Sequence, residues 1–284
     1  MFRVLFQNWL RQTARQQVMS AAQKQFAEAQ AKASAGPDEG PPTCDFALVF
    51  ALAVESGGLV DLLSEVSVVR GDGFKVRRGL RHSRTVALAE SGAGRANAAK
   101  AAHALIDAYR PRWLFSAGFA GALAPELQHG QVIVAREIVD TAGQAWTGDP
   151  QHIPPWLADV PGVRVDRLLC VDHVVRSPEE KLSLGRKHQA LAADMESLAV
   201  ALVCEERKVP FLAVRAISDA VEDRLPAEVE HLLDQKTTAA RLGSALGSIW
   251  RRPGSIKDLW QLKESALAAS DRLGRLLAGM MKHL

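Results

Sequence analysis

The chain of 284 residues has few cysteines and no long apolar run. Its three cysteines, Cys44, Cys170 and Cys204, form no Cys-x-x-Cys pair and have no histidine at ligand spacing. This argues against a disulfide framework and against a structural zinc site. The longest apolar run, from Phe46 to Val54, has nine residues, whereas a membrane-spanning helix needs about 20. We therefore expect a cytoplasmic protein without a transmembrane segment.

An excess of one charge is also lacking. Lys and Arg total 35 and Asp and Glu total 32, a net charge of +3. The middle of the chain carries no basic stripe, so we expect no nucleic-acid partner. The eight histidines show no HxxxH or HExxH spacing, and we expect neither a metal nor an organic cofactor. Apolar residues make up 48% of the chain, which excludes disorder and favours an ordinary globular core.

Three regions differ in composition. Residues 1–34 are rich in Ala and Gln and predict a helix, and residues 35–42 hold two glycines and three prolines, which predict a linker. After the linker, short apolar runs alternate with helical segments, the pattern of αβ units. We predict an N-terminal helix and linker over 1–44, a catalytic domain over 45–247 and a helical extension over 248–284.

Several expected strands are apolar on both faces, which is typical of a sheet covered on both sides. The strands are predicted at 46–54, 66–70, 74–78, 85–89, 113–117, 131–139, 167–171 and 211–217. Helices are predicted at about 94–109, 178–187, 195–207, 226–250 and 255–282. The second helix has a strong start signal, because Ser177, Pro178 and Glu180 form an N-cap, a proline at the first position and a glutamate at the third. Residues 141–165 predict a long irregular loop of the kind that covers a site.

Acidic residues and Gly-rich turns follow four of the expected strands. These residues are Glu55, then Gly92 and Gly94, then Gly118, Phe119, Ala120 and Gly121, and finally Ser218 and Asp219. Each has a simpler explanation alone, since an acid suits a helix N-terminus and a glycine permits a tight turn. Ligands of open α/β sheets bind at the carboxyl ends of the strands. Because acids and glycines recur at that edge, we interpret them as one site.

Two more charged residues lie in apolar stretches. Glu196 opens a helix whose continuation to Cys204 is apolar all round, so its carboxylate needs donors, either protein groups or the hydroxyls of a sugar. Arg215 lies within the apolar strand 211–217, where a guanidinium needs a partner. The nearby carboxylates are the candidates.

Together these motifs resemble a known family. They are Ala51 to Glu55, Ser91 to Gly94, Ala117 to Leu123, Gly130 to Val134, Asp194 to Ser197 and Val214 to Asp219. The set resembles the nucleoside phosphorylase superfamily, and within it the nucleosidases that hydrolyse methylthioadenosine and S-adenosylhomocysteine, with a related branch associated with hopanoid biosynthesis. The resemblance implies a three-layer α/β/α domain around a mixed sheet, a homodimer or larger homo-oligomer, and cleavage of the N-glycosidic bond of a purine nucleoside.

The resemblance also implies roles for individual residues. Asp219 would be the general acid at purine N7, and Glu55 the base for the attacking water. Met195 and Glu196 would hold the ribose, and Ser218 would assist at the base. Val174 would line the base pocket, and Gly92, Gly94, Gly118, Phe119, Ala120 and Gly121 would complete the substrate-binding set. An oxocarbenium-like transition state needs an acid for the leaving group and negative charge near the sugar, which agrees with these roles.

Two departures leave the substrate open. Phe119 stands where the nucleosidases have a small hydroxyl residue, and Val174 stands where an aromatic ring stacks on the base. A non-catalytic nucleoside-binding or membrane-associated interaction protein is therefore an alternative. Phosphorolysis is another, with Arg95 as the candidate phosphate ligand, although a carboxylate at Glu55 would repel phosphate. The favoured interpretation is hydrolysis of an adenosine-type nucleoside.

The two ends of the chain carry amphipathic patterns. Residues 1–27 hold four basic residues, no acidic residue and a cluster of apolar side chains. Such a helix suits peripheral contact with an anionic membrane, or packing on the core or across a dimer. Near the other end, an apolar stripe from Leu259 to Met280 predicts a helix that covers the core or a partner.

Overall fold

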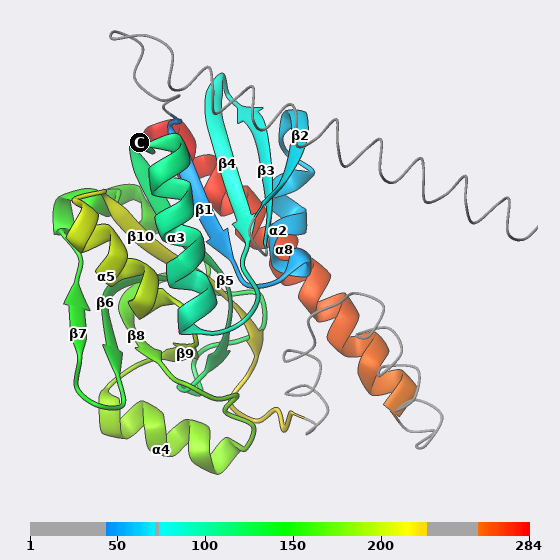
Figure 1. Ribbon diagram of the computed structural model, residues 1–284. Coiled ribbons are helices and arrows are strands. Elements are labelled where there is room, and N and C mark those ends of the chain that lie inside the picture. Colours follow the sequence, from blue (N-terminus) through cyan, green and yellow to red (C-terminus); the bar gives the residue numbers. More distant parts are fainter. Residues whose placement is uncertain (1–43, 72–73, 226–254) are drawn as a thin grey trace, which may run out of the picture. The chain divides into compact units, whose positions relative to one another are not determined.

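The computed structural model describes residues 44–71, 74–225 and 255–284 (Figure 1). The helix expected over 1–34, the linker over 35–42 and the helix expected over 226–250 lie outside the described residues. The chain divides into two compact units, Met1–Pro42 and Thr43–Leu284.

The described residues of the second unit form one mixed sheet of ten strands. The strands are β1 (Phe46–Phe50), β2 (Ser64–Gly71), β3 (Phe74–Arg81), β4 (Arg84–Glu90), β5 (Trp113–Ala122), β6 (Val132–Asp140), β7 (Ala145–Thr147), β8 (Val163–Cys170), β9 (Ala192–Asp194) and β10 (Phe211–Asp219). The described helices are α2 (Ala53–Val60), α3 (Arg95–Tyr109), α4 (Pro178–His188), α5 (Ser197–Arg207) and α8 (Ser255–His283), with short 3-10 helices η1 (Pro150–His152) and η2 (Pro155–Asp159).

The pairing of the strands brings their carboxyl ends to one edge. Strand β1 lies parallel to β4 and β5, and β5 is also parallel to β10. Strand β10 pairs antiparallel with β6, which continues through β8 and β9 back to β5, so five strands close a ring. Strands β4, β3 and β2 extend the sheet on the other side of β1. The ends of β1, β4, β5 and β10 therefore face the same region, where ligands bind in α/β proteins.

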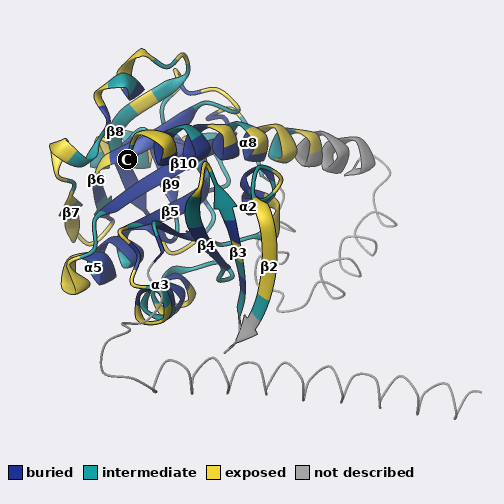
Figure 2. Ribbon diagram, turned by 90° about the horizontal axis from the view of Figure 1, so that it is seen from above, coloured by how far each residue is buried: buried dark blue, intermediate teal, exposed yellow. Residues whose placement is uncertain are grey.

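Helices cover both faces of the sheet, as expected for three layers. Helices α3 and α5 pack on one face and bury small and branched residues such as Ala102 and Leu198. Helices α2 and α8 pack on the other, where Leu59 and Leu273 are fully buried. Figure 2 shows the buried and exposed stripes of α8 as it lies across the sheet. The apolar stripe of the C-terminal segment thus covers the core, since Ala269, Leu276 and Met280 also belong to this cluster.

Helices α2 and α8 cross at very close range. A Cβ atom on Gly58 would overlap the backbone carbonyl of Ser270, and one on Gly274 would overlap the backbone of Gly58. The Ser270 hydroxyl accepts a hydrogen bond from the Gly58 N–H at 2.9 Å and donates to the carbonyl of Glu55 at 3.2 Å. The C-terminal helix therefore supports the turn of α2 that carries Glu55.

Several expected elements differ from the structure. The strand predicted over 46–54 ends at Phe50, and helix α2 begins at Ala53, because an apolar run suits a buried helix as well as a strand. The helix predicted from 195 begins at Ser197. Strand β8 begins at Val163 rather than at 167. The other expected strands and helices among the described residues agree within a few positions, except that β5 continues to Ala122.

The segment expected as an irregular loop contains β7, η1, η2 and the first residues of β8. Its side chains pack on the core. Trp146 meets Phe211 edge to face with ring centroids 5.0 Å apart, and Leu157 is fully buried on the side of α8. None of its residues lines the cavity described below. The segment 141–165 therefore packs on the sheet and does not cover the site.

Candidate active site

A cavity of about 210 Å³ opens at the carboxyl edge of the sheet. Among the predicted site residues, the cavity is lined by Glu55, Phe119, Ala120, Gly121, Val174, Met195, Glu196, Ser218 and Asp219. Gly92, Gly94 and Gly118 do not line it. The sequence motifs thus converge on one hollow, although they come from helices, strands and loops far apart in the chain.

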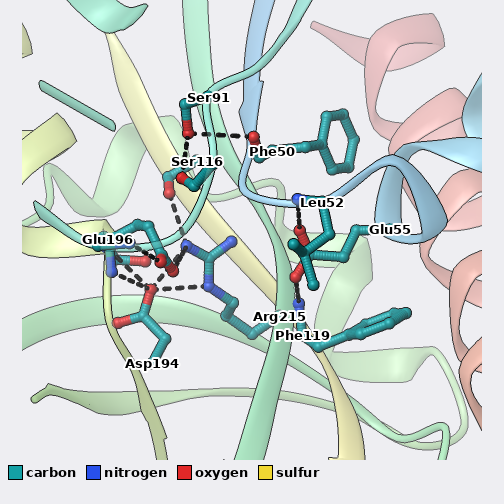
Figure 3. Close-up of polar contacts among 12 residues, drawn as sticks. Phe50, Leu52, Glu55, Ser91, Ser116, Phe119, Asp194, Glu196 and Arg215 are labelled. Carbon is teal, nitrogen blue, oxygen red and sulfur yellow. Dashed lines mark hydrogen bonds and ion pairs between the residues drawn. The ribbon is translucent and has the colours of Figure 1, made fainter. Parts of the chain in front are cut away.

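Glu55 lies in the first turn of α2 with both carboxylate oxygens bound to backbone. Oε1 accepts from the Phe119 N–H at 2.9 Å, and Oε2 accepts from the Leu52 N–H at 2.7 Å (Figure 3). Burial raises the pKa of Glu55, while the positive charge of Arg215 and the backbone donors act in the opposite direction. Glu55 is therefore a fixed, desolvated carboxyl group suited to take up a proton.

Gly118 leaves room for the side chains of both Glu55 and Arg215. A Cβ atom at this position would lie 2.8 Å from Glu55 Oε1 and 3.1 Å from Arg215 Nη1. Any larger residue would displace the carboxylate, the guanidinium or both. Gly118 thus acts by leaving room for two charged groups, and not by touching the cavity.

Glu196 is the N-cap residue of α5, and its side chain reaches across to the loop after β4. Its Oε1 accepts from the Gly94 N–H at 2.7 Å. Gly94 has φ 95°, a conformation that favours glycine. Burial and the negative charges of Asp194 and Glu55 raise the pKa of Glu196 to about 7, against the attraction of Arg215.

Arg215 of β10 is held mainly by Asp194. Its Nε and Nη2 donate to Asp194 Oδ2 at 2.8 and 2.6 Å, and Nη2 also donates to Ser116 Oγ at 2.7 Å (Figure 3). Glu196 Oε2 is 4.0 Å from the same nitrogen. The expected partner of the buried arginine is thus a nearby carboxylate. Its Nη1 is buried and has no hydrogen-bond partner among the described residues.

Asp219 is the last residue of β10 and lines the cavity. Its Oδ1 accepts from the Ser218 hydroxyl at 2.8 Å, and its Oδ2 is 2.6 Å from Lys181 Nζ. Gly121 permits this position, since a Cβ there would be 2.8 Å from Asp219 Oδ2. Sequence reasoning missed Lys181, because a lysine in the charged first turn of a helix carries no signal of burial.

Arg95, the candidate phosphate ligand, faces away from the cavity. Its Nη1 donates to Asp140 Oδ2 at 3.0 Å, and its Nη2 donates to the Cys170 carbonyl at 2.9 Å. Its Nε is 2.7 Å from Asp172 Oδ1. Two carboxylates therefore neutralise this guanidinium, and it is not among the residues that line the cavity.

The rest of the cavity wall is largely apolar. Its apolar members are Ala51, Leu52, Ala93, Leu123, Val171, Val174, Val175, Ala193 and Leu225. The Phe119 ring points away from Arg215 in Figure 3 and packs on the apolar cluster beside α8. The cavity thus combines an apolar wall with carboxylates in different settings, which suits an uncharged ring system bearing hydroxyl groups.

Three further observations concern expected absences. In the part of the chain that the structure describes, no group of three or more His, Cys, Asp and Glu side chains is arranged to hold a metal ion. No helix in the same part is long and apolar enough to cross a membrane. Cys44, Cys170 and Cys204 are all buried and free.

Helices cover both faces of the sheet, and buried carboxylates gather at its carboxyl edge. This arrangement is typical of α/β enzymes. The profile of the phosphorylase superfamily matches residues 45–165 and 158–251. The chain belongs to this superfamily.

Two proteins with similar sequences are nucleosidases. The chain is 26% identical over 220 residues to a 5′-methylthioadenosine/S-adenosylhomocysteine nucleosidase of Staphylococcus haemolyticus, covering 70% of this chain and 95% of the relative. It is 30% identical over 196 residues to the enzyme of that name from Haemophilus ducreyi, covering 62% and 84%.

Solved structures show the same fold. The nucleosidase of that name from Neisseria meningitidis, in complex with methylthio-immucillin-A, has a TM-score of 0.66 at 21% identity over 84% of this chain and 99% of the other. Futalosine hydrolase of Helicobacter pylori has a TM-score of 0.65 at 17% identity, with 85% and 99% covered.

Proposed function

We propose that the protein is a purine-nucleoside N-glycosidase that hydrolyses the N-glycosidic bond of an adenosine-type nucleoside. The observation that carries the proposal is the gathering of three buried carboxyl groups, those of Glu55, Glu196 and Asp219, in the wall of one cavity. A water molecule beside Glu55 in this cavity has the Glu55 carboxylate as its acceptor. Glu55 takes its proton as the oxygen attacks the sugar.

Glu196 serves the sugar in this proposal. Among the described residues, Glu196 Oε1 accepts a hydrogen bond from Gly94, while no such bond is made by its Oε2, which is 4.0 Å from Arg215. The remaining acceptor sites suit the ribose hydroxyls. A carboxylate beside the ribose also stabilises the positive charge of an oxocarbenium-like transition state. Met195 adds an apolar surface next to the ribose.

Asp219 serves the leaving base. It lines the same cavity as Glu55, with Ser218 bound to one of its oxygens. Delivery of a proton to purine N7 makes the base a neutral leaving group as the glycosidic bond breaks. Val174 and its apolar neighbours form the wall against which the purine ring packs.

Water is favoured over phosphate as the nucleophile. Arg95 is neutralised by Asp140 and Asp172, and Arg215 by Asp194. The carboxylates of Glu55 and Glu196 would repel an anion at this place. The names of the similar nucleosidases and of futalosine hydrolase agree with hydrolysis.

The proposal also covers the location of the enzyme, its oligomeric state and its contact with membranes. We infer a cytoplasmic homodimer or larger homo-oligomer, with residues 1–27 as a contact to anionic membrane surfaces. The basic and acid-free composition of that segment supports this inference. The catalytic domain over 45–247 and the flanking regions over 1–44 and 248–284 remain predictions.

Base release from a nucleoside panel tests the activity. Purified protein is incubated with methylthioadenosine, S-adenosylhomocysteine, adenosine and inosine, with and without phosphate, and free base is measured. We expect adenine release that phosphate does not accelerate, with free sugar as the second product. Asp219→Asn should lower kcat about 10³-fold because the proton donor is lost.

Asp159→Asn, an exposed aspartate in η2, is the matched control and should behave as the wild type. Ribose 1-phosphate as product would contradict hydrolysis. Absence of base release from every nucleoside would contradict the catalytic proposal and favour a nucleoside-binding protein.

A further inference from the structure

Helix α4 buries one residue fully among its eleven, and that residue is a lysine. Lys181 has a relative exposure of 0%, whereas the leucines of the same helix are only partly buried. Burying an ammonium group costs free energy unless its protons are bound and its charge is balanced. The position of Lys181 therefore needs a reason other than apolar packing.

The ammonium group of Lys181 makes two hydrogen bonds and one ion pair. Nζ is 2.6 Å from Asp219 Oδ2, donates to the Ala220 carbonyl at 2.6 Å and donates to the Asp223 carbonyl at 3.0 Å. The turn itself is closed by a hydrogen bond from the Ala220 N–H to Asp223 Oδ2 at 2.7 Å. Lys181 thus ties both the carboxylate of Asp219 and the backbone after it to α4.

Helix α4 is itself held firmly at the strand ends, at the lower edge of the domain in Figure 1. Ser177 caps it by accepting from the Glu180 N–H at 3.2 Å. Gly185 lies so close to β5 that a Cβ atom would be 2.6 Å from the Leu123 carbonyl. The lysine therefore projects from a fixed helix, and its ammonium group has a defined place beside Asp219.

Other charged groups near this pair have partners of their own. His173 is 2.9 Å from Glu180, His129 is 2.8 Å from Asp223, and Arg224 is 3.4 Å from Glu179. The cavity is also lined by Glu55, Glu196 and Asp194, and Asp194 forms an ion pair with Arg215. Among these described groups, Lys181 is the cation in contact with Asp219.

We propose that Lys181 is a positioning residue for the N-glycosidase reaction, and that the Lys181–Asp219 pair stores the proton that Asp219 delivers to the purine. This rests on the proposed function. In the resting pair the proton is on Lys181 Nζ. As the glycosidic bond breaks, its electron pair goes to the base, Asp219 passes one proton to N7, and Lys181 supplies one proton to Asp219. Lys181 becomes a neutral amine and regains a proton from solvent after the base leaves.

The pH dependence of kcat/KM for Lys181→Met and Lys181→Arg tests this inference, with Lys187→Met, an exposed lysine of the same helix, as control. In Lys181→Met the acid is Asp219 alone, so the alkaline fall of the rate should move to lower pH, with a loss of about 100-fold at pH 8.5 that lies in kcat. Lys181→Arg keeps the positive charge beside Asp219 but should also lower kcat, because a guanidinium keeps its proton and cannot supply it to Asp219. Lys187→Met should follow the wild type.

An alkaline limb of folded Lys181→Met that coincides with the wild type would overturn the inference, because a merely structural lysine changes the rate and not its pH dependence. A folded Lys181→Arg variant that keeps the wild-type kcat would overturn it as well. The wild-type profile decides the matter if a melting curve shows that neither variant folds. A wild-type rate that does not fall as pH rises through the neutral range supports the pair, and a rate that falls with rising pH in that range contradicts it. Absence of base release by the wild type would instead contradict the proposed function.

Discussion

Glu196 and Asp219 are buried carboxylates of one cavity, yet positive charge lies at different distances from them. The nearest cationic nitrogen to Glu196 Oε2 is Arg215 Nη2 at 4.0 Å, and that arginine is shared with Asp194. Asp219 Oδ2 lies much closer to a cation, at 2.6 Å from Lys181 Nζ. Two carboxyl groups in different settings can therefore serve the sugar and the base in different ways.

The raised pKa of Glu196 makes a prediction about stability. Its pKa rises from 4.5 to about 7 on folding, so the folded state binds the proton more tightly than the unfolded state. The free energy of unfolding should therefore fall as pH rises from about 4.5 to 7. Glu196→Gln removes this fall and should stabilise the protein by about 2 kcal/mol at pH 8 but little at pH 4.5, while lowering kcat/KM about 100-fold.

Thermal or urea unfolding at the two pH values measures this difference. Glu126→Gln, an exposed glutamate, is the control and should change neither stability nor rate. Equal stabilisation by Glu196→Gln at both pH values would contradict the electrostatic explanation. Such a result would point to packing as the cause.

At the scale of elements, the crossing of α2 and α8 connects the C-terminal helix with the site. Helix α8 contacts α2 through small residues, and its Ser270 hydroxyl donates to the Glu55 carbonyl. A change at this crossing should therefore affect both stability and the position of the Glu55 carboxylate.

Two glycines of α8 allow a matched comparison. Gly274→Ala forces the backbones of α2 and α8 apart and should lower the free energy of unfolding by about 1–3 kcal/mol. Gly279→Ala should be neutral or slightly stabilising, because its new Cβ would lie 3.8 Å from Trp156 and alanine favours a helix. Urea unfolding distinguishes the two, and equal effects would argue against a close crossing.

At the scale of the whole molecule, the chain divides into two units, Met1–Pro42 and Thr43–Leu284. We predict that the full chain binds vesicles with anionic lipids and that a truncated chain beginning at Thr43 does not, because residues 1–27 carry four basic and no acidic residues. Co-sedimentation with anionic and neutral vesicles measures this. Equal binding by both chains would contradict the membrane inference, and unchanged nucleosidase activity of the truncated chain is the control.

The sequence alone determined the superfamily motifs, the α/β class and most strands and helices, because apolar periodicity and turn chemistry are local signals. It also indicated that Glu55 and Asp219 belong to one edge, since the ends of parallel strands meet there, while the family resemblance added Glu196 to the same site. Elements that depend on contacts with distant parts of the chain were harder to predict from the sequence. The start of α2 was missed, and so was β9, which has only three residues and gains its pairing from β5 and β8.

Only the tertiary structure decided which charges face each other. Asp194 and Arg215 are 21 residues apart and form a buried pair, and Arg95 is withdrawn from the cavity by two carboxylates. Lys181 looks like a solvated helix residue in the sequence but is fully buried against Asp219. Burial and ion pairing depend on elements that come together from distant parts of the chain. The contacts between these elements, and not the local sequence pattern, therefore decide which charges in the site are balanced.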